Sequence, residues 1–394
     1  MELAVNGGKP VRESFLPYGQ QIIDDRDIEH VLETLKSPYI TQGPAIQEFE
    51  RRVASYVGVR HAVAFCNGTA ALHAACFAAG VGPGDEVLTT PITFAASANC
   101  VLYCGGTPRF VDIDEWTYNI DASLLEKAIT PRTKAIIPVD FTGQPADMER
   151  IMEIAEQRGL VVIEDAAHSL GALYKGKKVG TLAHMTMFSF HPVKHITTGE
   201  GGMIVTDSDE YDNKLRLFRS HGITRENLQR DDEGPWYYEM QALGYNYRMT
   251  DLQAALGVSQ MDKLDTFLAR RRDIAAYYSK EFSSVAGVII PYQLPYSDSA
   301  WHLYMLRMQM DLFTVDRKQI FNALRAENIG VHVHYIPVYY HPYYRELGYA
   351  KGLCPRAEHW YEEVLTLPLF PGMTDRDVQD VVQTVKKVLD YYRK

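Results

Sequence analysis

Short apolar runs alternate with amphipathic stretches along most of the chain. Each early run is rich in Val, Ile, Ala or Phe, and stretches with apolar residues at helical spacing lie between them. The runs span residues 61–66, 85–90, 107–114, 133–141, 160–166, 185–190 and 201–207. Alternation of strand and helix predicts a mainly parallel sheet that helices cover on both faces. Ligands of such α/β sheets bind beyond the carboxyl ends of the strands.

The pattern changes near Thr266. A long charged helix is expected there, followed by two predicted strands and two predicted helices at residues 301–310, 332–338, 317–330 and 375–392. The sequence therefore predicts a large sheet domain over residues 15–265 and a smaller α+β domain over residues 266–394. Residues 1–14 are expected to pack on the small domain or on a second copy of the chain.

Composition and charge argue against several classes of partner. The chain has 394 residues, is 46% hydrophobic and carries a formal net charge of −10. An acidic chain lacks the basic surface that nucleic acids and anionic lipids require. No stretch reaches the ~18 apolar residues of a membrane span, and the first residues do not read as a signal peptide. The five cysteines show no disulfide or metal-binding pattern, so we expect a cytoplasmic protein without a metal site.

Two charged residues follow apolar strands. Asp165 ends the run 160–165, and Lys194 follows the run 185–190 in the stretch FSFHPVK. Taken singly, the first is equally a helix cap, and most lysines are solvated. Together they are the acid and the amine that pyridoxal phosphate needs for its ring nitrogen and its aldehyde carbon. Burial would lower the pKa of such a lysine from ~10.4 toward ~7–8, where its amine is a nucleophile and a base.

An anion site and an aromatic ring extend this hypothesis. Gly68, Thr69 and Ala70 follow a strand and open a helix, whose free N–H groups suit a phosphate. The hydroxyls of Thr69 and Ser189 would add hydrogen bonds. Phe94 lies just past another strand, where its ring would stack on the cofactor. An ordinary strand-to-helix turn and simple core packing remain the alternatives for these positions.

Five stretches together resemble one family. They are SFHPVK, EDAAHSLG, NGTAALH, PVDFTGQPADM and GYNYRMTDLQAALG, and the resemblance extends from about residue 18 to about residue 370. The family comprises the sugar-nucleotide aminotransferases named after DegT, DnrJ, EryC and StrS. The resemblance implies a type I pyridoxal-phosphate-dependent aminotransferase fold. It also implies a homodimer in which the two subunits share each active site.

The resemblance implies roles for the cofactor residues. Lys194 would hold the cofactor as a Schiff base and shuttle a proton, and Asp165 would pair with the ring nitrogen. His168, where many members have Gln, would reach the cofactor hydroxyl. Asn246 would reach the phosphate or the substrate of the neighbouring subunit. The rest of the implied set is Gly68, Thr69, Ala70 and Ser189 at the phosphate, with Phe94 on the ring.

Further stretches are similar to the pseudaminic-acid branch of this family, among them SPYITQG, FRSHGI, WHLYML and VHYIPVY. This similarity implies that L-glutamate aminates C4 of a UDP-linked 4-keto-6-deoxy-N-acetylhexosamine, giving UDP-4-amino-4,6-dideoxy-N-acetyl-β-L-altrosamine. The implied sugar-nucleotide site comprises Tyr18, Pro38, Tyr39, Ile40, Thr41, Val333, His334, Tyr335 and Ile336. His195 stands where the branch usually has Pro or Asn, which keeps keto sugars leading to perosamine or 4-amino-arabinose as alternatives.

Several further residues allow two interpretations each. Arg248, and more weakly Arg219, is a candidate partner for the second carboxylate of glutamate, or else forms a structural ion pair. His332 and His334 share one face of a predicted strand and either face the site or pack as a pair. An aromatic cluster either stacks on substrate or forms a subunit contact; it comprises Tyr339, Tyr340, Tyr343 and Tyr344. A catalytically silent homologue is the alternative of another class, although both the lysine and the acid are present.

Overall fold

A large sheet forms the centre of the chain, for which the computed structural model describes residues 2–225, 228–230 and 234–394. Its seven strands have the order β1-β9-β8-β5-β4-β2-β3. β9 is antiparallel to both neighbours, and the other adjacent strands run parallel. The strands are β1 (His61–Phe65), β2 (Glu86–Thr89), β3 (Thr107–Phe110), β4 (Thr133–Ile137), β5 (Val161–Asp165), β8 (Met185–Ser189) and β9 (Gly202–Thr206). The predicted large, mostly parallel sheet is confirmed.

Both faces of the sheet are buried, because successive strand residues alternate between two apolar cores. On β1, Val63 and Phe65 pack with one set of helices, whereas Ala62 and Ala64 pack with another. The first set is α3 (Gly68–Ala78), α4 (Ala96–Tyr103) and α7 (Asp209–Arg219). The second set is α2 (Pro44–Val57) and α8 (Asp251–Met261), continued by α5 (Ala122–Ala128) and α6 (Met148–Arg158).

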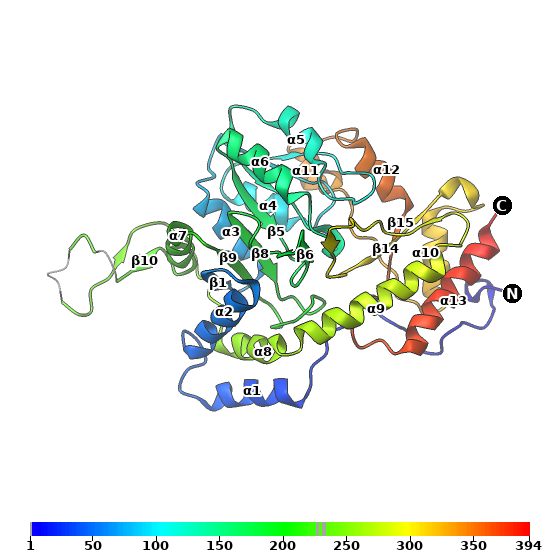
Figure 1. Cartoon of the computed structure of the whole chain (residues 1–394), viewed down its shortest axis with the longest axis horizontal. Coiled ribbons are helices and arrows are strands. Elements are labelled where there is room, and N and C mark those ends of the chain that lie inside the picture. Colours follow the sequence, from blue (N-terminus) through cyan, green and yellow to red (C-terminus); the bar gives the residue numbers. More distant parts are fainter. Residues whose placement is uncertain (1, 226–227, 231–233) are drawn as a thin grey trace.

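A smaller sheet lies at the far end of the long helix α9 (Leu264–Phe282), as Figure 1 shows. Its three strands are antiparallel and have the order β12-β14-β15. They are β12 (Val288–Ile289), β14 (Tyr304–Met308) and β15 (Val364–Leu367). This sheet shares one core with α9, α10 (Arg317–Ala326) and α13 (Asp375–Tyr392). The expected smaller α+β unit is therefore present.

The first residues of the chain pack on this smaller unit. Leu3 is buried in its core, and the backbone N–H groups of Ala4 and Val11 donate to the carboxylate of Glu327 at 2.9 and 2.8 Å. Arg12 forms ion pairs with Asp377 and Asp380 on α13. Both chain ends consequently lie beside α13 (Figure 1).

The predicted strand at residues 332–338 is wrong. Within this segment only His332 forms a β-bridge, to Thr366. The backbone N–H of Val338 instead donates to the carbonyl of Pro91 beside the large sheet, at 3.0 Å. Pro337 has no N–H to give to a ladder. The segment is an extended link between the two units and not a strand within one sheet.

The tyrosine cluster is largely core. Tyr339 and Tyr344 are fully buried with Phe141 and Trp360, and only Tyr343 is well exposed. Tyr339 donates to Glu358 at 2.6 Å. The short elements here are η4 (Val338–Tyr340), α11 (Pro342–Glu346) and α12 (Pro355–Glu363). Their core includes residues next to the large sheet, so the exact boundary between the two units stays a prediction.

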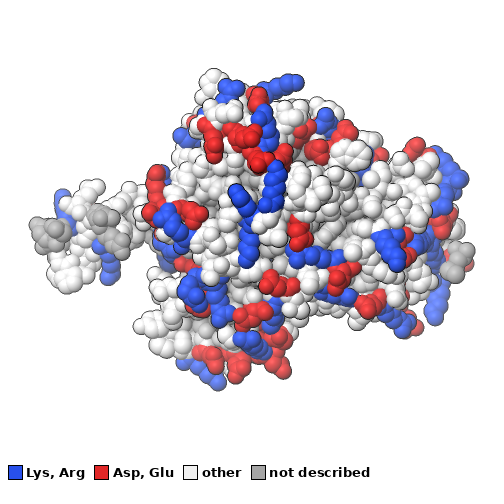
Figure 2. Space-filling view, in the orientation of Figure 1, with Lys and Arg blue, Asp and Glu red and all other residues white. Residues whose placement is uncertain are grey.

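The remaining elements are short. A third, three-stranded sheet comprises β13 (Ser297–Asp298), β6 (Leu173–Tyr174) and β7 (Lys177–Lys178), and β10 (Ile223–Thr224) pairs with β11 (Glu239–Met240) in an arm beyond α7 (Figure 1). Helix α1 (Asp25–Lys36) and the short helices η1 (Ala4–Asn6), η2 (Phe141–Gly143) and η3 (Met310–Leu312) complete the set. Acidic and basic side chains intermingle on the face in Figure 2. Among the described residues, no helix is long and apolar enough to cross a bilayer.

A buried carboxylate links α2, β1 and α7. Glu50 accepts from the backbone N–H of Ala64 at 2.8 Å, from Arg219 at 2.6 Å and from Arg216 at 3.0 Å. Arg219 also donates to the carbonyl of Ala64 at 2.8 Å. A guanidinium held this way has a structural role, so Arg219 is not available as the expected partner of a glutamate carboxylate.

We predict that Glu50→Ala lowers the free energy of unfolding by about 3 kcal/mol, since it removes the buried carboxylate that two arginines and a backbone N–H share. Glu48→Ala is the matched control on the same helix. Glu48 pairs with Arg51 and Arg52 at the surface, where such pairs contribute about 0–1 kcal/mol. Urea unfolding followed by circular dichroism measures both changes. Equal losses in the two variants would contradict the role given to Glu50.

Candidate active site

Strand register brings the ends of β1, β8 and β5 to one edge of the large sheet. Phe65 and Ser189, the last residues of β1 and β8, both pair with Gly202, the first residue of β9. Asp165, the last residue of β5, pairs with Met187. The residues that follow β1, β5 and β8 therefore meet at the carboxyl edge, where the sequence predicted ligand binding.

The turn after β1 lies against Ser189. A Cβ atom added to Gly68 would come within 3.3 Å of the sulfur of Met187 and 3.6 Å of Ser189 Oγ. A Cβ on Gly202 would lie 2.6 Å from the backbone of Asn67, so the second glycine lets the turn approach β9. Asn67 caps α3 by accepting from Ala70 N at 2.8 Å. The cap occupies the N–H of Ala70 and leaves those of Gly68 and Thr69 at the helix start for an anion.

Asp165 is a buried carboxylate with defined partners. One oxygen accepts from Ser97 Oγ at 2.6 Å and the other from Ala167 N at 3.2 Å. Thr93 in turn shares a hydrogen bond of 2.7 Å with Ser97. Burial raises the pKa of Asp165, and the bonds from Ser97 and Ala167 and the charge of Lys194 oppose that rise. The side chain is therefore oriented by α4 to meet a cation at the carboxyl edge.

The amine of Lys194 lies in a poorly solvated place beside this acid. Desolvation lowers the pKa of Lys194 to about 8, although the charge of Asp165 raises it. Nζ is 3.3 Å from Nε2 of His302, in the loop that precedes β14. At neutral pH about a tenth of such amines are uncharged, far more than for an ordinary lysine.

Imidazole and phenol rings line the other side of the amine. His168 is buried, its ring lies 4.3 Å from that of His302, and its Nε2 is 3.3 Å from the hydroxyl of Tyr335. Burial lowers the pKa of both histidines well below the usual range, so both are neutral. Nδ1 of His168 has no hydrogen-bond partner among the described residues. A buried polar atom of this kind suits a polar group on a bound ligand.

Phe94 follows β2 at the same edge. Its ring is 62% exposed and lies 6.2 Å from the ring of Tyr335. An exposed phenyl ring next to buried polar residues offers a flat surface for another ring to stack on. Simple core packing, the alternative for this position, does not fit the exposure.

The expected sugar-nucleotide residues fall into three places. Tyr18 packs on His332 and His334, with ring centroids 5.4 and 5.1 Å apart, and His334 also bonds Thr366 Oγ1 at 2.9 Å. His332 and His334 stack on each other at 4.4 Å, as expected for a shared face. Tyr335 reaches His168, and Ile336 is exposed.

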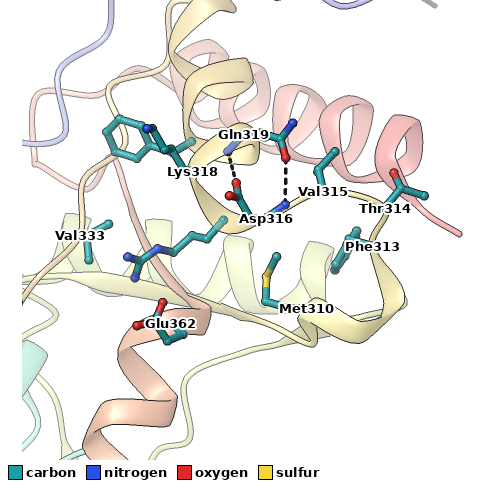
Figure 3. A pocket seen from close by; sticks show the side chains of 11 residues that line it. Met310, Phe313, Thr314, Val315, Asp316, Lys318, Gln319, Val333 and Glu362 are labelled. Atoms are coloured by element: carbon teal, nitrogen blue, oxygen red, sulfur yellow. Dashed lines mark hydrogen bonds between the residues drawn. The ribbon is translucent and has the colours of Figure 1, made fainter. Parts of the chain in front are cut away.

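Val333 faces the opposite way. It lines a separate cavity beside the start of α10, together with Asp316, Gln319 and Glu362 (Figure 3). Side chains alternate along an extended segment, so a residue between His332 and His334 points away from them. The structure thus does not bring Val333 together with the other expected sugar-nucleotide residues.

The turn Pro38, Tyr39, Ile40 and Thr41 lies at the surface next to the start of α8. Thr41 forms a bridge with Thr250, and the carbonyl of Ile40 accepts from Asp251 N at 3.0 Å. Asn246 is exposed and bridges Ser220, and Arg248 is half-buried nearby in sequence. Within residues 2–225, 228–230 and 234–394, no hydrogen bond, ion pair or ring contact joins this turn, Asn246 or Arg248 to Lys194 or Asp165.

The sequence did not indicate two residues that touch the central pair. Ser97 is one small polar residue in a mostly apolar helix, and His302 lies in a stretch whose pattern predicted a strand. In neither case does periodicity carry a signal for chemistry. The stretch WHLYML entered only as part of the resemblance, which gave His302 no role.

The assembled residues fit pyridoxal phosphate. The cofactor needs an amine for its aldehyde, an acid for its ring nitrogen, a donor or acceptor for its hydroxyl and an anion site. Lys194, Asp165, His168 and the Gly68–Ser189 turn region meet these needs at one edge of the sheet. A surface that is apolar at Phe94 and charged deeper in also suits an aromatic ring with a phosphate.

Comparison with known proteins supports this fit. Residues 21–386 match the DegT/DnrJ/EryC1/StrS aminotransferase family. The chain is 45% identical to the spore coat polysaccharide biosynthesis protein SpsC of Bacillus subtilis, over 96% of this chain and 98% of SpsC. It is 40% identical to GDP-perosamine synthase of Caulobacter vibrioides, over 93% of this chain and 96% of that protein.

A solved structure has the same fold. PseC of Helicobacter pylori, an aminotransferase involved in the biosynthesis of pseudoaminic acid, superposes with a TM-score of 0.89 at 34% identity, covering 96% of this chain and 100% of PseC. With the match over nearly its whole length, the chain belongs to the DegT/DnrJ/EryC1/StrS aminotransferase family, a family of sugar aminotransferases that work with pyridoxal phosphate.

Proposed function

We propose that this chain transfers the amino group of L-glutamate to the C4 keto group of a UDP-linked 4-keto-6-deoxy-N-acetylhexosamine. The product is UDP-4-amino-4,6-dideoxy-N-acetyl-β-L-altrosamine, a precursor of pseudaminic acid or a related surface glycan. The single observation that carries transamination is the desolvated amine of Lys194 beside the buried acid Asp165. The sugar is supported by the likeness to PseC and by the motifs shared with that branch.

The chemistry divides between the cofactor and the chain. Bound pyridoxal phosphate supplies an electron sink for the bond that breaks at the substrate carbon. Lys194 would move the proton from the substrate carbon to the former aldehyde carbon, because its lowered pKa keeps part of the amine uncharged. Asp165 would keep a proton on the ring nitrogen by its negative charge, and Ser97 fixes the direction of its carboxylate. The neutral imidazole of His168 adds no competing charge.

A second candidate function concerns the sugar alone. GDP-perosamine synthase is 40% identical to this chain, a higher identity than that of PseC. A GDP-linked 4-keto-6-deoxyhexose is therefore the alternative acceptor. The residues proposed to face the nucleotide lie on irregular segments, where a few substitutions change specificity without touching the lysine and the acid.

We further propose a homodimer in which a second copy completes each site. Helix α1 turns its polar side inward: Asp27 is buried against Gln260 and Lys263, at 2.8 and 2.7 Å. Its apolar stripe Ile28, Leu32 and Leu35 is 45–56% exposed. A helix in a lone globular chain buries its apolar face, so this stripe fits an interface. The arm adds exposed Trp236, Met240 and Leu243.

Lys194→Ala is expected to abolish transamination and to remove every covalent link between cofactor and chain. Wild-type protein mixed with pyridoxal phosphate and reduced with borohydride should carry the cofactor mass on the peptide that contains Lys194. Lys214→Ala, which removes a surface lysine paired with Glu210, is the control and should behave as wild type. Activity or a labelled peptide in Lys194→Ala would refute the role of the amine.

Substrate choice separates the two candidate sugars. With glutamate as donor, we expect kcat/KM for the UDP-linked 4-keto-6-deoxy-N-acetylhexosamine to exceed that for GDP-4-keto-6-deoxymannose by at least about a hundredfold, as for sites that hydrogen-bond their substrate. Initial rates at several concentrations of both substrates should give the parallel lines of a ping-pong reaction. A preference for the GDP sugar would favour the perosamine-like alternative, and turnover of neither would refute both.

The interface proposal predicts a change of mass in solution. Replacing Leu32 and Leu35 together by Asp should convert a dimer to monomers in sedimentation, because two charges would be buried at the contact. Glu33→Gln, on the same helix, is the control and should leave the dimer intact. A wild-type monomer, or a double variant that remains dimeric, would rule out α1 as the interface.

A further inference from the structure

The amine of Lys194 is hydrogen-bonded to His302 and not to Asp165. Nζ lies 3.3 Å from His302 Nε2, whereas no ion pair joins Lys194 to Asp165 among the described residues. The lone pairs of Asp165 are directed to Ser97 and Ala167 instead. The hydrogen bond to His302 therefore competes with the attraction between an ammonium and a carboxylate in a dry site.

His302 accepts from the amine in either of its protonation states. Burial keeps its imidazole neutral, and the charges of Lys194 and Arg271 act in the same direction. An ammonium group only donates, so Nε2 is the acceptor and the ring proton lies on Nδ1, which has no hydrogen-bond partner among the described residues. Both a charged and an uncharged amine donate, so the hydrogen bond persists while Lys194 gains or loses a proton.

The backbone on both sides of His302 is fixed by an unusual clamp. Its N–H donates to the carbonyl of Thr142 at 2.8 Å, and Leu303 N donates to the same oxygen at 3.2 Å. Thr142 and Trp301 have φ values of 64° and 49°, in the left-handed region that costs non-glycine residues about 1–3 kcal/mol. Such conformations persist where surrounding structure holds them, and they gather at functional sites.

Arg271 and Gly143 also contact the backbone at Trp301 and His302. The buried guanidinium of Arg271 lies 3.4 and 3.3 Å from the carbonyls of Trp301 and His302 and donates to Leu369 O at 2.9 Å. At Gly143 a Cβ would come within 2.7 Å of Trp301 N and 2.8 Å of the carbonyl of His168. Gly143 thus lies close to the backbones of both His168 and His302, whose tilted rings are 4.3 Å apart.

We propose that His302 is a positioning residue for Lys194: it holds the detached amine by a hydrogen bond, in the place from which the amine moves protons. The inference rests on the proposed transamination. In cofactor-free protein, removing the acceptor lets the amine turn toward Asp165, whose charge stabilises the ammonium form. In the loaded enzyme, where Asp165 faces the ring nitrogen, the amine instead loses its fixed direction, and proton transfer slows while substrate binding does not.

The test compares His302→Leu with His302→Gln. Gln keeps an acceptor near the position of Nε2, and Leu removes it at similar volume. Cofactor-free protein is treated with an amine-acylating reagent at a series of pH values, and mass spectrometry follows the peptide that contains Lys194. For His302→Leu we expect the apparent pKa of Lys194 to rise by at least one unit, with a tenfold slower modification at neutral pH. His302→Gln should titrate as wild type.

Kinetics of the loaded enzyme give a second readout. In His302→Leu, kcat should fall about a hundredfold with KM for both substrates changed less than about threefold. His73→Leu, which removes a buried imidazole outside the site, is the control for loss of packing. An unchanged or lowered pKa of Lys194 in His302→Leu would overturn the inference, and so would an equal change in His302→Gln.

The outcomes separate this inference from the proposed function. If wild-type protein neither attaches the cofactor nor transaminates, the proposed function fails. If wild-type protein does both and His302→Leu matches it in titration and kcat, only the role of His302 falls. Should His302→Leu not fold, as judged by circular dichroism, His302→Gln and His302→Met carry the same titration, with Met expected to follow the prediction for Leu.

Discussion

Desolvation of the amine of Lys194 opposite the carboxylate of Asp165 is the constraint on which the site depends. The same exclusion of water lowers the pKa of the lysine and raises that of the acid, so each group is moved toward its neutral form. It also keeps the imidazoles of His168, His195 and His302 neutral. Among these four basic side chains, only the amine of Lys194 therefore exchanges protons near neutral pH. The three surrounding imidazoles have much lower pKa values and stay uncharged.

The fold provides that constraint with ordinary means. Parallel strands place the residues after β1, β5 and β8 at one edge, and the antiparallel β9 starts there with Gly202, which admits the turn at Asn67. Glu50 ties α7 and β1 together behind that edge. Helix α9 spans both units, and its Arg271 supports the peptide that carries His302. In the proposed role of His302, the smaller unit contributes a group that positions the amine of Lys194.

The sequence predicts Asp165 and Lys194 because each follows a continuous apolar strand, and burial on both faces leaves a clear signal in such strands. It does not predict Ser97 or His302, whose places depend on contacts from distant segments. The extended link 332–338 has the alternation of a strand, yet its hydrogen bonds go to both units. Tyr339 and Tyr344 show the converse. Their aromatic side chains suggest a binding surface, yet both are buried in a core that includes residues next to the large sheet. The sequence pattern of each segment alone does not predict such a core.

Chemistry and specificity occupy different kinds of structure in this chain. The lysine, the acid and the glycine turn lie at or just beyond the ends of strands, whose positions are fixed by the hydrogen bonds of the sheet. The segments proposed for the sugar, 38–41 and 332–336, are irregular, and the first lies beside the exposed stripe of α1. Substitution in irregular segments disturbs few backbone hydrogen bonds, so it alters recognition at little cost to the fold. This division accounts for relatives at 40% and 34% identity whose names indicate different sugars. By the same argument, substitutions in these irregular segments would change the acceptor sugar while Lys194, Asp165 and His302 stay the same.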